Sequence, residues 1–334
     1  MTEPWDEGIK KFAYSISRAL HDRADVLPVN VARSGVDGEA AERVGGSRTF
    51  LAPALRAKLR SFSPDIVLYV PSPSSTLASF FRSRALRWAV PRAAHGMVAM
   101  IPRRHAPIWK PLLRFTAPDI IFVPSYASLL YLKRLGIDAE LLPFGVDPGV
   151  FSAGDHEERA ILRERYRIPN DAFVFLHVGH LSRKRNLEAL VVLKRRMPDA
   201  RVIVVSSTST AEDRMLRREI EAAGIRVVRE FVPVEEYYRL ADCYVFPVEE
   251  SEGSVELPLS VLESLSSQLP VLTTPFGGLR DFLPEGPDLI YWSGTAELIE
   301  KAAALRRGDR PITRSMEQFT WPNIASRILD TFDS

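Results

Sequence analysis

The chain has little of what marks several classes of protein. Its 334 residues include a single cysteine, Cys243, which excludes an internal disulfide and a cysteine-based metal site. No apolar run reaches the roughly 18 residues of a membrane-spanning helix, and no signal-peptide pattern, repeat or low-complexity tract is visible. A net charge of +2 is too small for nucleic-acid binding through bulk electrostatics. We therefore expect a cytoplasmic protein with no nucleic-acid partner.

Metal ligands are also scarce. The chain contains no D-x-D sequence and no His/Asp cluster with metal-ligand spacing, so we expect no metal. Cys243 lies in the apolar run 241–247, which predicts a buried structural thiol. Hydrophobic content of 46% and charged content of 26% are typical of a soluble globular protein, and the length suffices for two domains.

Acidic residues are absent between Asp65 and Asp119. This interval instead carries basic residues interleaved with large apolar ones. The basic residues are Arg82, Arg84, Arg87, Arg92, Arg103, Arg104, Lys110 and Arg114, and the apolar ones include Phe80, Phe81, Trp88, Met97, Met100, Ile101, Ile108 and Trp109. Such a mixture suits an anionic membrane surface, so segment 82–114 predicts peripheral attachment at the inner face of the membrane. The alternative is a basic surface that meets a soluble anionic substrate or no partner.

The second half alternates between apolar runs and runs with helical spacing. Expected strands are 173–178, 201–205, 226–231, 243–246, 270–273 and 289–292, and expected helices are 186–197, 212–223, 234–240, 258–267 and 296–305. Strict alternation predicts right-handed βαβ units and a parallel sheet covered on both faces.

The first half repeats this pattern less clearly. Expected helices are 7–21 and 125–135, and expected strands are 26–31, 66–70, 89–94 and 120–123. A Pro- and Gly-rich linker at 143–152 separates the halves. The sequence therefore predicts an α/β protein of two doubly wound, Rossmann-like domains that face each other across a cleft. Since the first helix begins almost at Met1, we expect either that a first strand is missing from the reading frame or that the first sheet is one strand short.

A glycine and several cations follow the expected strand 173–178, in the sequence Gly179-His-Leu-Ser-Arg-Lys-Arg-Asn186. The glycine permits a sharp turn at the end of the strand. Arg185 can make a bidentate contact to a diphosphate, and His180 can add a donor. The alternative is a basic helix start on the surface, which is disfavoured because cations destabilise a helix N-terminus.

Carboxylates gather in residues 247–278, PVEESEGSVELPLSVLESLSSQLPVLTTPFGG. Glu249, Glu250, Glu252 and Glu256 occupy a loop, and Glu263 follows on an expected helix. Carboxylates accept hydrogen bonds from sugar hydroxyls, and a helix N-terminus offers N–H groups to a phosphate. Taken alone, the run favours a solvated acidic loop. Its place after a cationic loop favours a nucleotide-sugar site.

Several motifs, taken together and in order, resemble the retaining, nucleotide-sugar-dependent glycosyltransferases of family 4, the group 1 glycosyl transferases with the GT-B fold. Residues 143–147 with Phe151 are similar to the linker of that family, and 178–181 with Arg185 to its diphosphate loop. Residues 237–247 and 258–278 are similar to its next two elements, and 319–332 to a closing helix that returns to the first domain. The resemblance is nearly continuous from 143 to 333. Before 143 it is limited to 6–9, 91–96 and 123–125.

The resemblance implies a domain plan. Residues 1–145 would form an acceptor-binding domain, 146–318 a nucleotide-sugar-binding domain, and 319–334 the helix that crosses back.

The resemblance also assigns donor-binding residues. Gly179, His180, Arg185, Ser260 and Val261 would bind the diphosphate, with His180 in place of the arginine of the family.

The glutamate pair of the family, E-x7-E, is only partly present. Glu263 matches the second glutamate, which would hold the ribose hydroxyls. Val255 stands where the first glutamate is expected, so Glu256, or alternatively Glu252, would contact the sugar.

On the acceptor side the resemblance is weaker. His95, at the end of the expected strand 89–94, is similar to the active-site histidine of the family, and His105 is its competitor. Gly8 is similar to the glycine of an acceptor loop.

Together these residues predict metal-independent transfer of a sugar, with retention, from a nucleotide-diphosphate sugar to a lipid-linked, glycan or small-molecule acceptor. The alternative is a non-catalytic GT-B protein that binds a nucleotide sugar or a partner. A sugar-nucleotide epimerase of the same fold is disfavoured by the pattern at 258–278.

Overall fold

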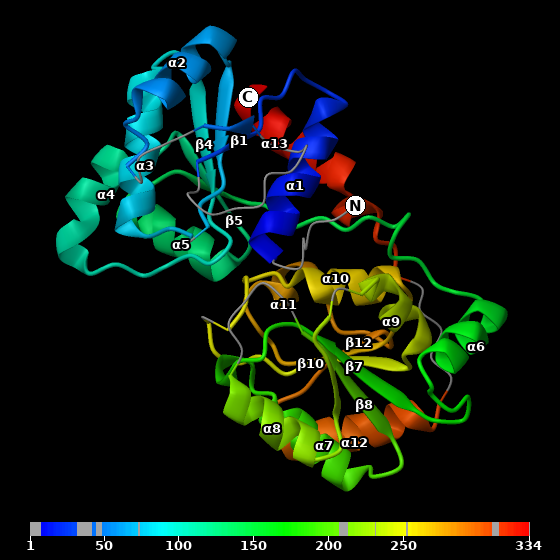
Figure 1. The fold of residues 1–334 in the computed structure, drawn as a ribbon. Coiled ribbons are helices and arrows are strands. Elements are labelled where there is room, and N and C mark those ends of the chain that lie inside the picture. Colours follow the sequence, from blue (N-terminus) through cyan, green and yellow to red (C-terminus); the bar gives the residue numbers. More distant parts are fainter. Residues whose placement is uncertain are drawn as a thin grey trace. The chain divides into compact units, whose positions relative to one another are not determined.

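The computed structural model describes residues 8–31, 42–44, 49–72, 74–206, 213–230, 232–251, 253–308 and 314–333. The chain forms two compact units, one of Ile9–Phe144 with Trp321–Ser334 and one of Gly145–Thr320. Each unit is built on a parallel β-sheet with helices packed against it (Figure 1). Within the described ranges, no helix is both long and apolar enough to cross a bilayer.

The first unit contains short strands between helices. Its helices are α1 (Gly8–His21), α2 (Pro53–Phe62), α3 (Leu77–Ala89), η1 (Pro107–Trp109), α4 (Lys110–Thr116), α5 (Tyr126–Leu135) and α13 (Trp321–Asp333). Its strands are β1 (Val29–Asn30), β2 (Glu42–Arg43), β3 (Ile66–Tyr69), β4 (Ala94–Val98), β5 (Ile120–Val123) and β6 (Ala139–Leu141). Strands β3-β4-β5-β6 form one sheet in that order, and β1 and β2 pair separately.

Aromatic side chains hold the first and last helices against the first unit. The rings of Phe12 on α1 and Trp321 on α13 meet edge to face at 5.5 Å. Phe332, near the end of α13, packs against Phe122 of β5 at 6.1 Å. Figure 1 shows α1 and α13 on one side of the sheet, and α3 and α4 on the other.

The second unit contains six parallel strands. Its strands are β7 (Val174–Val178), β8 (Arg201–Val205), β9 (Arg226–Val228), β10 (Cys243–Phe246), β11 (Val271–Thr273) and β12 (Leu289–Tyr291). Its helices are α6 (His156–Arg165), η2 (Arg183–Arg185), α7 (Glu188–Arg196), α8 (Arg214–Ala222), α9 (Val234–Leu240), α10 (Leu259–Ser266), α11 (Leu279–Phe282), α12 (Thr295–Arg306) and η3 (Glu317–Phe319). Helices α7, α8 and α12 cover one face of the sheet, and α9, α10 and α11 the other (Figure 1).

The core of the second unit explains why the sequence pattern was readable there. Strands β7, β10 and β11 are buried along their whole length apart from Val178, so they appear in the sequence as continuous apolar runs. Cys243 is fully buried, as predicted for a structural thiol.

One predicted strand of the first unit is wrong. Residues 89–94 were expected to form a strand, but α3 extends to Ala89, and β4 begins only at Ala94. The Thr76 side chain caps α3 by accepting from the Ser79 N–H at 3.3 Å. Buried Phe80, Ser83 and Leu86 then recur at helical spacing. This buried face continues to Ala89, so the helix includes the first residue of the predicted strand.

Candidate functional site

The sheet of the second unit has a topological switch point between β7 and β10. The strand order is β12-β11-β10-β7-β8-β9. From β7 the chain adds β8 and β9 on one side, and from β10 it adds β11 and β12 on the other side. In open parallel sheets, ligands bind beyond the carboxyl ends of the strands at this point. The loop that starts at Gly179 follows β7, and the carboxylate-rich loop 247–257 follows β10.

Arg185 is a buried cation at this edge of the sheet. Only 8% of the residue is exposed, and its Nε has no hydrogen-bond partner. No carboxylate among the described residues forms an ion pair with it. Burial lowers the pKa of the guanidinium to about 10. A buried cation without an anionic partner is costly, which makes this position suited to an anionic ligand.

Gly179 makes room for Arg185. A Cβ added at Gly179 would collide with Nη1 of Arg185 and lie 3.0 Å from its Cζ. The glycine therefore allows the guanidinium to lie against the backbone at the end of β7. The sequence predicted these two residues as parts of one loop, and the structure brings them into contact.

His177 lies on β7, two residues before Gly179. It is completely buried, and its Nδ1 donates to the Val245 carbonyl at 2.9 Å. This bond fixes the neutral tautomer and leaves Nε2 unprotonated. Burial first, and then the neighbouring Arg185, lower the pKa of His177 to about 3. The imidazole is thus neutral and cannot add repulsion to Arg185 at ordinary pH.

Tyr244 connects the strand ends to the start of α10. Its hydroxyl oxygen lies 2.7 Å from Ser260 Oγ and 3.2 Å from the Val178 carbonyl. Burial raises the pKa of this phenol, so it stays protonated. Ser260 and Val261 occupy the first turn of α10. The Val261 side chain is fully buried, and its N–H donates to the Pro258 carbonyl at 3.1 Å, so a ligand could share this N–H only as a second acceptor. The opening N–H groups of a helix suit a phosphate.

Glu263 is buried on α10 instead of facing solvent. It is 5% exposed, and its Oε2 accepts from the Tyr238 hydroxyl at 2.9 Å. Burial, and next the nearby Glu263, raise the pKa of Tyr238 well above its usual range, so the phenol remains a donor. Tyr238 therefore orients the carboxylate.

The position of Glu256 depends on the Gly277–Gly278 loop. The Gly278 N–H donates to the Glu256 carbonyl at 2.8 Å. Gly277 has φ +54°, and a Cβ there would overlap that carbonyl and lie 2.8 Å from the Glu256 Cα. The two glycines thus hold the backbone of Glu256 in place. Its predicted alternative, Glu252, lies outside the described residues.

The carboxylate loop also packs against the cationic loop. A Cβ at Gly253 would collide with the Lys184 carbonyl. Asn186 Nδ2 lies 3.4 Å from Glu249 Oε1. The two motifs that the sequence placed far apart are therefore neighbours in the second unit.

The sequence offered a basic helix start at the three consecutive cations 183–185 as a disfavoured alternative. The structure agrees, because no α-helix begins there. The three cations form the short turn η2, and α7 starts later, at Glu188. Arg183 is half exposed and pairs with Glu188 at 2.9 Å and Glu219 at 2.7 Å. Arg185 is the buried member of the group. His180 lies between β7 and η2, in the same loop.

In the first unit, His95 does not lie where the sequence placed it. It was expected at the end of a strand, but it is the second residue of β4 and 2% exposed. Its Nε2 donates to the Val90 carbonyl at 3.1 Å, and burial lowers its pKa. The shortened strand explains the error, because the strand begins five residues later than predicted. The position favours a structural role.

His105 lies in the segment that follows β4, at the carboxyl end of this sheet. Its Nε2 donates to the Ser75 carbonyl at 2.8 Å, and its backbone N–H donates to the Tyr131 hydroxyl at 2.6 Å. It is only partly buried. Of the two candidate histidines, His105 is thus placed at the ligand-binding edge of its sheet. Gly8 is the first residue of α1.

The opposite edge of the second sheet contains a different polar cluster. Arg163 is 3% exposed and donates to Asp242 Oδ2 at 2.7 Å, and Arg159 also pairs with Asp242. Asp242 Oδ2 further accepts from the Val174 N–H at 2.7 Å. A cavity of about 770 Å³ opens beside these groups. Asp242 is already paired with both arginines, and these contacts join α6 to the start of β7 and β10. The motif residue Asp242 is therefore structural.

Comparison with known proteins agrees with the geometry at the switch point. Residues 172–307 match the family described as "Glycosyl transferases group 1". The matched residues lie within the second unit and run from β7 to α12, with Arg185, Tyr244 and Glu263 among them. The narrower family 4 assignment stays a prediction.

Relatives extend the similarity beyond this domain. The sulfoquinovosyl transferase SQD2 of Arabidopsis thaliana is 27% identical over 305 residues, which cover 83% of this chain and 58% of that protein. TuaC of Bacillus subtilis, named for teichuronic acid biosynthesis, is 26% identical over 218 residues, covering 64% and 51%. The chain thus spans little more than half of the length of these relatives.

A solved structure shows the fold. Anabaena Alr3699/HepE in complex with UDP-glucose aligns with a TM-score of 0.75 at 15% identity, over 100% of this chain and 98% of that one. The GT-B fold predicted from the sequence is confirmed by this likeness together with the two parallel sheets.

Sequence reasoning missed three residues of the candidate site. Tyr238 was predicted only as part of the helix 234–240 and the motif 237–247, Tyr244 as part of a strand in that motif, and His177 as part of the strand 173–178. The available signal was a polar atom within an otherwise apolar strand or helix, since buried hydroxyls and imidazoles need partners.

Proposed function

We propose that the protein is a glycosyltransferase that moves a sugar, with retention and without a metal, from a nucleotide-diphosphate sugar to an acceptor. The observation that carries the proposal is Arg185, a buried cation without a carboxylate partner at the switch point of a group 1 glycosyl transferase domain. The ligand that removes the cost of such a cation is an anion. A diphosphate on a sugar is the anion that a transferase of this class would use.

The residues around Arg185 then have distinct tasks. Arg185 and His180 would donate to the diphosphate, together with the opening N–H groups of α10 at Ser260 and Val261. Gly179 gives these donors access. Cations and fixed N–H dipoles can stabilise the charge that develops on a leaving diphosphate, which is why we propose no metal.

The carboxylates would recognise the hydroxyls of the donor. Glu263, oriented by Tyr238, would accept from the ribose. Glu256, held by the Gly277–Gly278 loop, would accept from the sugar. The buried Tyr238–Glu263 pair supports the ribose assignment, because a carboxylate kept in a fixed rotamer loses little entropy on binding.

The transfer step needs little from the protein beyond positioning. The bond between the anomeric carbon and the diphosphate oxygen breaks through an oxocarbenium-like transition state. The acceptor oxygen bonds to the same face of that carbon, and the departing phosphate oxygen takes the acceptor proton. His105, at the carboxyl edge of the first sheet, is our candidate for positioning in place of His95, and Gly8 stays a predicted acceptor residue.

The acceptor class is proposed as lipid-linked, glycan or small-molecule, and the location as the cytoplasm. The names of two relatives, a sulfoquinovosyl transferase and a teichuronic acid glycosyltransferase, support acceptors in cell-envelope or membrane chemistry. The UDP-glucose bound by the Anabaena protein supports a UDP-sugar among the first donors to test. The second candidate function is nucleotide-sugar binding without transfer, favoured by Val255 at the position of the first motif glutamate.

A donor screen tests the proposal. We expect at least one of the UDP-, GDP- and ADP-sugars to raise the melting temperature by mass action. Turnover of that donor, by hydrolysis or transfer, should persist in EDTA, fall with Glu263→Ala, and fall more with His105→Ala than with His95→Ala at equal folded fraction. Binding without turnover for every acceptor supplied would favour the second candidate. No thermal shift with any donor would refute both.

A further inference from the structure

Helices α3, η1 and α4 of the first unit expose five large apolar side chains among their described residues. Phe81 is 52% exposed, Trp88 51%, Ile108 80%, Trp109 42% and Phe115 61%. Single exposed apolar residues are ordinary, but five within 35 residues of one another in sequence need an explanation. We call these five residues, with the basic residues interleaved among them, the α3–α4 surface.

Helical spacing places these side chains on outward faces. Phe81, Arg84 and Trp88 are spaced i, i+3 and i+7 on α3, so they share one face. Ile108 and Phe115 have the same i, i+7 spacing across η1 and α4. The opposite faces carry buried residues, such as Ser83 and Leu86 on α3 and Leu113 on α4.

Arg84 joins the two helices at this surface. Its guanidinium carbon lies 4.5 Å from the ring centre of Phe115 on α4 and 5.9 Å from that of Trp88 on α3. The two apolar stripes are therefore contiguous, with a cation stacked between their rings. Figure 1 shows α3 and α4 lying beside each other on the same side of the first sheet.

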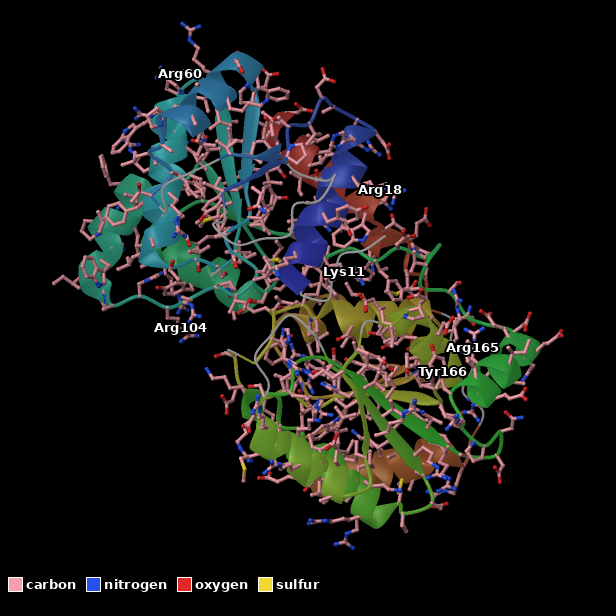
Figure 2. The ribbon with its side chains drawn as sticks, viewed as in Figure 1. Lys11, Arg18, Arg60, Arg104, Arg165 and Tyr166 are labelled. Carbon is pink, nitrogen blue, oxygen red and sulfur yellow. The ribbon has the colours of Figure 1, made fainter. Side chains whose placement is uncertain are left out.

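The charged side chains of residues 66–118 are all basic. The sequence has no acidic residue between Asp65 and Asp119. Arg92, Arg103, Arg104 and Arg114 are exposed around the apolar side chains, and Figure 2 shows Arg104 extending from the segment between β4 and η1. Asp119 bounds the interval and is paired with Arg87. The exposed cations near the apolar residues are thus not neutralised by carboxylates of the same interval.

We infer that the α3–α4 surface docks on an anionic lipid bilayer. Trp and Phe side chains insert into the boundary between headgroups and acyl chains, while Arg and Lys bind the anionic headgroups. Charge complementarity favours this partner over a second copy of the chain. An isologous dimer would place this basic surface against itself, cation against cation.

The inference deepens the proposed function, since a bilayer would bring a lipid-linked acceptor to the first unit. It does not depend on that function, because docking requires no donor and no transfer. Donor binding at Arg185 and vesicle binding at the α3–α4 surface can therefore fail separately.

Co-sedimentation with vesicles tests the inference. The probes are vesicles of phosphatidylcholine alone and of phosphatidylcholine with phosphatidylglycerol. The variant is Trp88→Ser/Phe115→Ser, and its matched control is Ile161→Ser/Met215→Ser, which removes two apolar residues of the second unit that are 52% and 60% exposed. We expect the wild type and the control to bind the anionic vesicles at least about tenfold more tightly than the neutral ones, and the variant to lose about tenfold. Higher salt should weaken binding.

Each contrary outcome overturns the inference. These outcomes are no binding by the wild type, equal binding to neutral vesicles, or equal binding by the variant. A dimer that dissociates in the variant, with no vesicle binding by either protein, would assign the surface to a second copy. If Trp88→Ser/Phe115→Ser fails to fold by circular dichroism, Ile108→Ser replaces it. An unchanged donor-induced melting shift in the variant would show that the donor site is intact.

Discussion

Replacement of Arg185 by methionine separates folding from donor binding. The pKa of Arg185 falls from its usual 12.5 to about 10 because the side chain is buried. At about 1.4 kcal/mol for each pKa unit, the charged form is about 3 kcal/mol less stable there than in water. Because the pKa is lowered in the folded state, this cost is fully present below pH about 10. Methionine fills a similar volume without charge.

The ligand-free Arg185→Met protein should therefore be more stable at neutral pH. Allowing for lost packing, we expect a gain of about 1–3 kcal/mol, or roughly 2–12 °C in the melting temperature of the second unit. Donor affinity should change in the opposite direction. Loss of charge-assisted hydrogen bonds to a diphosphate costs about 2–4 kcal/mol, roughly 30- to 1000-fold in Kd.

Differential scanning fluorimetry with and without donor measures both effects, and isothermal titration gives Kd. The control is Arg183→Met, because Arg183 is half exposed and pairs with surface carboxylates. It should keep the donor-induced shift. The reasoning is refuted if Arg185→Met melts below the wild type without donor, or if it retains the wild-type affinity.

Three further predictions concern the same unit. In urea unfolding, Gly277→Ala should destabilise the protein by about 1–3 kcal/mol more than Gly294→Ala. Both glycines have positive φ, but only a Cβ at Gly277 would collide with a neighbouring backbone. Equal losses of stability would contradict this packing argument. His177 has a pKa of about 3 in the folded protein against 6.5 in the unfolded chain, so the free energy of unfolding should fall by up to about 1.4 kcal/mol per pH unit as the pH drops below 6.5. The His177→Gln variant should lose less stability between pH 7 and pH 5. Parallel curves for the two proteins would argue against a buried neutral imidazole. Glu263→Gln can still accept from Tyr238, so it should unfold like the wild type but bind donor about tenfold more weakly by titration calorimetry; unchanged affinity would remove Glu263 from the ribose site.

The sequence predicted the second unit well because its strands are buried. The expected strands 201–205 and 243–246 and the helix 234–240 have the observed bounds. In the first unit it overlooked the helices α2, α3 and α4 and the strands β2 and β6, and it misplaced a strand at 89–94. The elements there are short, and their half-buried strands give weaker patterns, as in β3 and β6.

The candidate site was predicted in its parts but not in its connections. Glycine and arginine at the end of a strand, and a glutamate on the following helix, are visible in a linear pattern. The linear pattern does not show that the Tyr238 hydroxyl donates to Glu263, or that Arg185 Nε has no hydrogen-bond partner. Both depend on which side chains meet after folding. His95 shows the same limit. The strand begins five residues later than predicted, so His95 lies near its amino end and not at its carboxyl end.

The sequence by itself determined the α/β class, the order of the motifs and the residue types available for an anionic, hydroxyl-rich ligand. These properties follow from periodicity and local chemistry, which act over a few residues. Only the tertiary structure decided that Arg185 is buried without a carboxylate partner, whereas Arg183 is half exposed and paired with carboxylates. It also decided that Asp242 serves the fold. Burial and pairing are set by contacts between segments far apart in the chain, and they determine whether a charge stabilises the protein or is held for a ligand.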